Sequence, residues 1–242
     1  MLTIIFSILA FQINPDFNLP FLISDNQINF YDHDLNLINE LPIENFKEKT
    51  TDKLHLLLKN HELYFLGKLS GDVYKLDGNK IVRQDKTLDH RLNIASNIYL
   101  NNDTIFKYGG YGYWSQRDFI IYYDTPTHEW QIYKANYSDY QPEGMFEGLH
   151  FKTEKGIYFF GGYVVNKKNR IKTNPNKDVV YFDFETKKYS YLGKAFKDFD
   201  RLIYLIKDDK YMYFSNREEL IQLDLHNNEI AYYDLPNKLW AF

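Results

Sequence analysis

Few side chains of the sequence have the types and spacing that catalysis or metal binding requires. The chain contains no cysteine, which excludes disulfides, thiolate metal sites and a cysteine nucleophile. Glu48, Asp52 and His55 are spaced like a metal triad, but His55 opens an apolar run and Asp52 lies in a charged linker. The seven histidines are scattered with no pair at ligand spacing, and the fingerprints of nucleotide binding and serine hydrolysis are absent. We therefore expect no metal, no cofactor and no catalytic residue.

Side chains suited to recognition are more prominent. The 22 Tyr, 19 Phe and 3 Trp make the chain 18% aromatic. Three polar segments, 111–118, 134–148 and 164–178, together carry aromatic rings, lysines and arginines, and both aromatic and guanidinium side chains are enriched at binding surfaces. The candidate ligand-binding residues in them are Tyr111, Tyr113, Trp114, Arg117, Tyr137, Tyr140, Lys167, Lys168 and Arg170.

The charge balance limits the class of partner. The chain carries 29 Lys and Arg against 33 Asp and Glu, a formal net charge of −4. A dedicated nucleic-acid binder normally shows a basic excess on one face, so we expect no nucleic-acid partner. With 242 residues, 44% of them apolar, the chain is long enough to bury a sizeable core.

The elements that position these residues are predicted to be β-strands. Apolar residues seldom recur at helical spacing, whereas short β-branched and aromatic runs punctuated by Asn, Asp and Gly recur throughout. One hairpin pattern repeats every 41 to 59 residues: an apolar or aromatic pair, an aspartate, a polar turn and another apolar residue. The aspartates are Asp32, Asp77, Asp124, Asp183 and Asp224.

The repeat holds at finer detail. In four of the five units an apolar or aromatic residue follows the aspartate by six positions: Ile38, Trp130, Tyr189 and Ile230. Aspartate suits the turn because its side chain bonds nearby backbone groups. Since a second hairpin precedes this one in most units, we predict four antiparallel strands in each.

Two of the units resemble the kelch repeat. The segment 105–130 contains a hydrophobic strand, the diglycine Gly109-Gly110, a spacer, and a Tyr and a Trp separated by six residues. The unit with Gly161-Gly162 is similar, with Phe182 and Tyr189 as its aromatic pair. Glycines allow a strand end to turn sharply, and large rings can pack between adjacent sheets. The resemblance is strongest over residues 98–192 and implies a kelch-type β-propeller of about five four-stranded blades.

The number of blades departs from the family pattern. Kelch propellers usually have six or seven blades, and the first of the five counted here has an innermost strand only if residues 2–11 supply it. Three explanations of the count stay open: the ring is small but complete, the chain is a piece of a longer protein, or the pattern misses some strands. We expect residues 1–242 to form one β-propeller domain.

The beginning of the chain allows two interpretations. Residues 1–11 form the only continuous apolar stretch, about half the length of a bilayer span, so we expect no integral membrane segment. Residues 1–12 are either a short signal segment or part of the first strand. A signal segment would place the protein outside the cytoplasm, and a strand would leave it in the cytoplasm. No Lys or Arg precedes the apolar run, which speaks against export.

The resemblance implies two places for a ligand. Segments 111–118, 134–148 and 164–178 would emerge together on one face of the propeller, where insertions build the working surface. The axial funnel of the family is the second place, and by position its residues here would be Lys53, Arg91, Glu147 and Arg201.

The function predicted from this arrangement is a non-catalytic kelch-like binding module that recognises a protein or a glycan through the loop-bearing face. The alternative is a sugar-processing enzyme similar to the sialic acid mutarotases of the superfamily, with Glu147 and Arg201 in the funnel. The copper radical oxidases of the superfamily need a cysteine-crosslinked tyrosine, and this chain has no cysteine.

Overall fold

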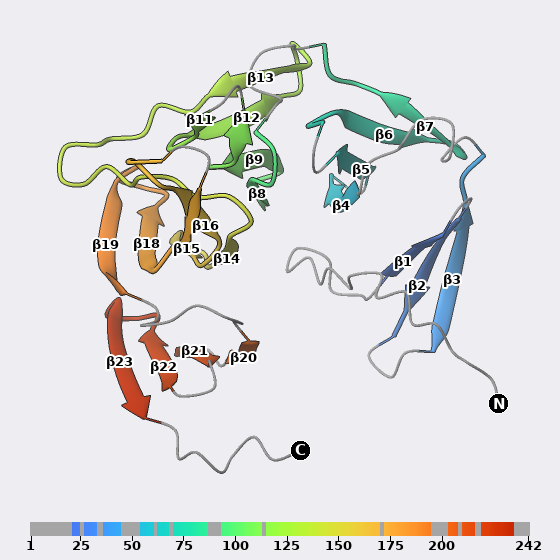
Figure 1. Cartoon of the computed structure of the whole chain (residues 1–242). Helices are drawn as coiled ribbons and strands as arrows, with labels where there is room; N and C mark the ends of the chain where they lie inside the picture. The colour runs from blue at the N-terminus through green and yellow to red at the C-terminus, as the bar shows by residue number, and fades with distance from the viewer. Residues whose placement is uncertain are drawn as a thin grey trace. The chain divides into compact units, whose positions relative to one another are not determined.

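Strands and turns make up the part of the chain that the structure describes. The computed structural model describes residues 21–24, 27–32, 36–44, 54–60, 62–67, 70–86, 93–112, 115–169, 172–194, 203–207, 210–215 and 219–234. Over these ranges no residue is helical, so the all-β prediction is confirmed (Figure 1). No described segment forms a helix long and apolar enough to cross a membrane.

The chain divides into two compact units, and each is described by itself. The first comprises Met1–Ile94, Ile98–Lys107 and Ile121–Ile132, and the second comprises Ala95–Asn97, Tyr108–Ile120 and Tyr133–Phe242. The prediction of a single domain over residues 1–242 stays a prediction.

The first unit contains most of three antiparallel sheets. One sheet has the order β1-β2-β3, with β1 at Phe21–Ser24, β2 at Gln27–Tyr31 and β3 at Leu37–Pro42. The next has the order β4-β5-β6-β7, with β4 at Leu54–Lys59, β5 at Glu62–Gly67, β6 at Val73–Asp77 and β7 at Lys80–Arg83. The third has the order β8-β9-β12-β13, with β8 at Asn97–Asn101, β9 at Thr104–Tyr108, β12 at Ile120–Asp124 and β13 at Glu129–Ile132.

The second unit contains two larger sheets and two short hairpins. One sheet has the order β14-β15-β18-β19, with β14 at Leu149–Lys152, β15 at Gly156–Phe160, β18 at Asp178–Asp183 and β19 at Tyr189–Lys194. The other has the order β20-β21-β22-β23, with β20 at Ile203–Lys207, β21 at Tyr211–Ser215, β22 at Glu219–Asp224 and β23 at Glu229–Asp234. The hairpins are β10 (Tyr111–Gly112) with β11 (Ser115–Gln116), and β16 (Tyr163–Val165) with β17 (Thr173–Pro175).

The four-stranded sheets follow the predicted organisation. In each of them the strands lie side by side in chain order, with the two short hairpins inserted between the second and third strands of their sheets. The first repeat shows three strands. The strand expected over residues 2–11 lies outside the described residues.

Three of the aspartate-centred hairpins share one turn geometry. The amide of the fourth residue after the aspartate donates to the aspartate carbonyl oxygen, at 2.8 to 3.0 Å. That fourth residue has a positive φ of 58 to 61°, a conformation that the closed turn requires. The residues concerned are His128, Lys187 and Asn228.

The carboxylates reinforce these turns. The Asp183 carboxylate accepts from the amide of Thr186 at 2.7 Å, and the Asp224 carboxylate accepts from the amide of His226 at 2.8 Å. Such bonds satisfy backbone groups that the strand ladder leaves open, which explains why aspartate recurs at this position.

The predicted register holds in the later repeats and fails in the first. Across the hairpins the ladder pairs Tyr123 with Trp130, Phe182 with Tyr189 and Leu223 with Ile230. In the first repeat the register shifts, so that Phe30 pairs with Asn39 and Tyr31 with Leu37. The bulge leaves Ile38 unpaired and 51% exposed. A bulged residue interrupts the alternation of side chains between the two faces of the strand, so the Ile38 side chain does not point into the core.

Cores form where successive sheets pack face to face. In the first unit Ile28 of the β1–β3 sheet belongs to one buried cluster with Leu56, Phe65 and Tyr74 of the β4–β7 sheet. In the second unit the β14–β19 and β20–β23 sheets share one cluster of buried apolar side chains. Its members are Phe151, Tyr158, Phe160, Val179, Tyr181, Met212, Ile221 and Leu223.

Trp130 links two sheets of the first unit. Its side chain is 2% exposed, and its indole Nε1 donates to the carbonyl oxygen of Gly71, between β5 and β6, at 3.2 Å. The Nζ atom of the fully buried Lys107 lies 4.5 Å from the centre of the indole ring. A cation over the face of a buried indole is attracted by the ring quadrupole, so Trp130 also stabilises a buried charge.

We expect Trp130→Ala to lower the free energy of unfolding by about 3–5 kcal/mol, as large-to-small core substitutions do. Denaturant titration measures the loss, and Ile132→Ala on the same strand, where the side chain is 50% exposed, is the control. A loss for Trp130→Ala below about 1 kcal/mol would show that the contact between the sheets adds little to stability.

Candidate functional site: the loop-bearing face

Glycine permits an unusually close approach of two backbones at the end of β9. Gly109 has a φ of +72°, and a Cβ atom on it would lie 2.2 Å from the carbonyl oxygen of Met145. The amide of Gly110 donates to the same oxygen at 2.7 Å. No other residue fits at position 109, because a side chain there would displace Met145.

The second diglycine holds the same linker from its other side. A Cβ atom on Gly162, whose φ is +70°, would lie 2.4 Å from the carbonyl oxygen of Phe146. Phe146 and Tyr163 exchange two backbone hydrogen bonds of 2.9 and 3.1 Å. The linker residues 145–148 are therefore held between the two glycine pairs that the sequence singled out.

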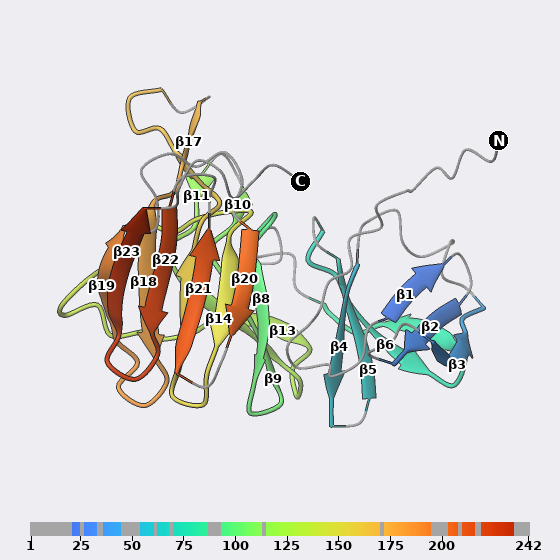
Figure 2. The same cartoon turned by 90° about the horizontal axis from the view of Figure 1, so that it is seen from below.

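Gln116 joins the three inserted segments. Its Nε2 donates to the carbonyl oxygens of Glu143 and Gly144 at 2.6 and 3.0 Å, and its Oε1 accepts from the amide of Val165 at 2.5 Å. One side chain on β11 thus connects the linker and the β16–β17 hairpin. Figure 2 shows β10, β11 and β17 at the same end of the second unit.

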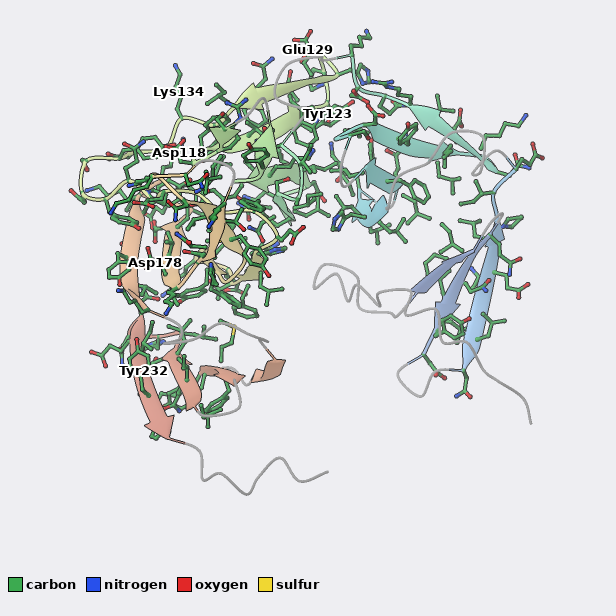
Figure 3. The ribbon with its side chains drawn as sticks, viewed as in Figure 1. Asp118, Tyr123, Glu129, Lys134, Asp178 and Tyr232 are labelled. Atoms are coloured by element: carbon green, nitrogen blue, oxygen red, sulfur yellow. The ribbon has the colours of Figure 1, made fainter. Side chains whose placement is uncertain are left out.

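The loop-bearing face is defined here as the described residues of 111–118, 134–148 and 164–178. Aromatic contacts add to its hydrogen bonds: the ring of Phe146 lies 5.8 Å from Tyr111 and 6.0 Å from Tyr163 between centroids. Gln141 donates from Nε2 to the Asp118 carboxylate at 3.0 Å (Figure 3 labels Asp118). The structure therefore brings together the three segments that the sequence analysis grouped.

Two of the predicted ligand-binding tyrosines pack against an outer strand. The Tyr137 ring stacks on Tyr189 of β19 at 5.6 Å with an angle of 19°, and the Tyr140 ring lies 5.9 Å from Tyr191 of the same strand. These contacts hold the linker to the sheet, so part of their role is structural. Arg117 is also partly engaged, with its guanidinium carbon 5.8 Å from the centre of the Phe119 ring.

The remaining predicted residues divide into three groups. Lys167 and Lys168 are exposed, and Lys167 pairs with the Glu143 carboxylate at 2.6 Å, a solvent-exposed contact that contributes little to stability. Glu147 is exposed, has a φ of 54° and donates its amide to the carbonyl oxygen of Ala95 at 2.8 Å. The others lie outside the described residues: Lys53, Arg91, Tyr113, Trp114, Arg170 and Arg201.

A cavity of about 240 Å³ opens beside the loop-bearing face. Tyr140, Glu143 and Met145 of the linker line it together with Asn174 of β17. Asp178, the first residue of β18, and Lys194, the last residue of β19, also line it (Figure 3 labels Asp178). Tyr140 is thus the predicted residue that reaches this cavity.

Asn176 fixes one wall of the cavity. It is 5% exposed, and its Nδ2 donates to the carbonyl oxygen of Gly161 at 3.0 Å. Its amide donates to the carbonyl oxygen of Gly162 at 2.8 Å, and its Oδ1 accepts from the amide of Asp178 at 3.3 Å. The diglycine and the start of β18 are therefore locked together through one buried amide side chain.

The cavity contains a carboxyl group in an unfavourable electrostatic position. Burial raises the pKa of Asp178 above its ordinary value, the Glu143 carboxylate raises it further, and Lys194 opposes both effects. Burial, followed by the charges of Asp178 and Glu143, raises the pKa of Tyr140 to about 12. At neutral pH the Tyr140 hydroxyl therefore keeps its proton and can donate a hydrogen bond.

The sequence analysis missed Gln116, Glu143, Asn176 and Asp178. All four lie in or beside polar insertions, where such residues normally face solvent. One signal was present: Asp178 is the first residue of a strand whose second residue, Val179, is fully buried. Among the described residues no cluster of three His, Asp or Glu side chains could hold a metal ion.

We expect Gln116→Ala to loosen the loop-bearing face, because three hydrogen bonds between its segments are lost. Native-state hydrogen exchange should show faster exchange at the amide of Val165, and the free energy of unfolding should fall by about 1–3 kcal/mol. Gln131→Ala on β13 is the matched control. Unchanged exchange at Val165 would show that the segments hold together without Gln116.

We expect Asp178→Asn to stabilise the fold at neutral pH. A carboxyl group whose pKa is raised on folding stabilises the folded state fully below its unfolded pKa, near 3.8, and this contribution is lost as the pH rises through the folded pKa. The advantage of the variant in thermal midpoint should accordingly appear at pH 7 and vanish near pH 3.5. A midpoint below that of the wild type at pH 7 would show that the carboxylate is stabilised by its surroundings.

No family model matches the chain, and no curated protein matches it.

Proposed function

We propose that this chain is a non-catalytic binding module of the kelch β-propeller type, whose loop-bearing face recognises a glycan or a protein. The strand orders support the propeller. Four sheets each place four antiparallel strands side by side in chain order, as the blades of a propeller do. Within each unit, successive sheets also share buried clusters, as neighbouring blades would.

One observation carries the binding role: three separate insertions are joined into a single structured surface. Unconstrained insertions would move independently, whereas Gln116 and the two diglycines fix these backbones relative to one another. A surface ordered before binding loses less conformational entropy when a ligand binds.

The exposed chemistry of the face fits recognition better than catalysis. It offers tyrosine rings, the Arg117 guanidinium, and backbone and side-chain amides, which are typical of binding surfaces. The described part of the face contains no histidine, and its hydroxyl side chains, of Ser, Thr and Tyr, have no base of that kind beside them. Recognition is therefore the function that the face supports best.

The test uses the paired substitution Trp114→Ala with Arg117→Ala, screened on a glycan array and on a peptide panel. We expect the wild-type chain to bind members of one panel, and the double variant to lose at least about tenfold in affinity, because hot-spot aromatic and arginine residues dominate binding. Lys155→Ala, an exposed position in the same unit but outside the loop-bearing face, is the control. Full binding by the double variant would exclude this face as the recognition surface.

A further inference from the structure

The cavity beside the loop-bearing face has the size of a small ligand. Its volume of about 240 Å³ lies below the roughly 300–1,000 Å³ typical of sites for drug-sized ligands. A single sugar ring is a ligand of that smaller class. Two contacts hold the walls of the cavity: the side chain of Asn176 donates to the Gly161 carbonyl oxygen, and the backbone of Gly144 lies against that of Arg117.

Gly144 shows how tightly one wall is set. It has a φ of +78°, and a Cβ atom there would lie 1.9 Å from the carbonyl oxygen of Arg117. The linker backbone therefore lies directly on the loop residues Arg117 and Asp118, which follow the β10–β11 hairpin. The neighbouring lining residues Glu143 and Met145 have correspondingly fixed backbones.

The polar groups of the lining are balanced in charge and in hydrogen-bonding type. Glu143 and Asp178 carry carboxylate acceptors, of which Glu143 also pairs with Lys167 outside the lining, while Lys177 and Lys194 carry ammonium donors. The amide of Asn174 can donate and accept, and the protonated hydroxyl of Tyr140 can donate. A charged ligand would leave part of this set uncompensated, whereas the hydroxyl groups of a neutral sugar can both donate and accept.

Aromatic rings complete the lining. Tyr140 and Tyr108 both line the cavity, but the Tyr108 ring is fully buried, with its centroid 4.1 Å from that of Phe159, so the half-buried Tyr140 is the ring that a ligand can contact. An aromatic ring gives a rigid, mostly apolar wall against which the C–H face of a sugar can pack. The lining thus provides an apolar wall and a polar edge, the two surfaces that a sugar ring presents.

Asp178 provides a further argument. Its half-buried carboxylate is less stable there than in water, and an asparagine of the same shape would avoid that cost. Strained or destabilising charged groups are found preferentially at functional sites. A ligand hydroxyl that donates to this carboxylate would supply the partner that compensates its burial.

We propose that this cavity binds one neutral sugar ring of a glycan, with the carboxylates of Glu143 and Asp178 accepting hydrogen bonds from its hydroxyl groups. The inference depends on the proposed function, because it names the ligand class of the same face. An amino sugar, a sugar acid and a peptide side chain are the competing occupants.

The experiment titrates the protein with single methyl glycosides and follows binding by calorimetry and by saturation-transfer NMR. The neutral probes are the methyl glycosides of glucose, galactose, mannose and N-acetylglucosamine, and the charged probes are glucosamine and glucuronic acid. We expect at least one neutral glycoside to bind and the charged probes to bind more weakly. Binding by no neutral probe, or preference for a charged one, would overturn the proposal.

Two isosteric variants locate the binding. Asp178→Asn and Glu143→Gln should each weaken the neutral glycoside at least about tenfold, as the loss of a hydrogen bond to a charged acceptor does. Glu185→Gln, which removes an exposed carboxylate at the opposite end of the β18–β19 hairpin, should leave the affinity within about twofold. Thermal midpoints of all three variants verify that they fold.

The results separate this proposal from the proposed function. If a glycan or peptide binds and Trp114→Ala with Arg117→Ala abolishes the binding while Asp178→Asn does not, the loop-bearing face is a binding surface and the cavity is not its sugar site. If both sets of variants leave binding unchanged, both proposals fail.

Discussion

The close approach of the linker backbone to two pairs of glycines is the constraint on which the second unit depends. Met145 lies against Gly109, and Phe146 lies against Gly162, at distances that exclude a Cβ atom, and the amide of Gly110 donates to the Met145 carbonyl oxygen. A connection between two sheets would otherwise cross the surface as a free loop. Here backbone hydrogen bonds fix the linker at both ends, so the residues of the linker have defined positions.

That constraint converts three insertions into one surface. Because residues 145–148 are immobilised, the preceding residues Tyr140 and Glu143 are placed at the mouth of a cavity. Gln116 and Asn176 then connect the hairpins to the same stretch of backbone. Rigid scaffolds that carry a few fixed polar groups are the usual basis of specific ligand binding.

The sequence predicted the strands better than the site, for a physical reason. The aspartate turn and the aromatic pairs, such as Tyr123 with Trp130, are local patterns, so their hairpins and their register could be derived from spacing. Ile38 was an exception, because nothing in its neighbourhood marks the bulge that turns it outward. The diglycines were also identified from the sequence, but the close approach of the linker backbone to both of them was not.

The partners of the site residues could not be derived in the same way. Gln116 bonds residues 27 to 49 positions away, and such contacts depend on how distant backbones are brought together. Tyr137 was assigned to ligand binding on its type alone, and its stacking on Tyr189 depends on a linker path that no local pattern encodes. Asp178 resembled any solvated loop residue until its burial was known.

The burial of Asp178 connects stability with function in the second unit. Two sheets of this unit share a large apolar cluster, which stabilises the fold enough for it to tolerate one unfavourable carboxylate. The same carboxylate would be solvated and unremarkable if the β16–β17 hairpin and the linker were free to move away from it. The glycine constraint and the buried charge therefore belong to one arrangement, in which a fixed backbone keeps a carboxyl group half-buried at the edge of the cavity.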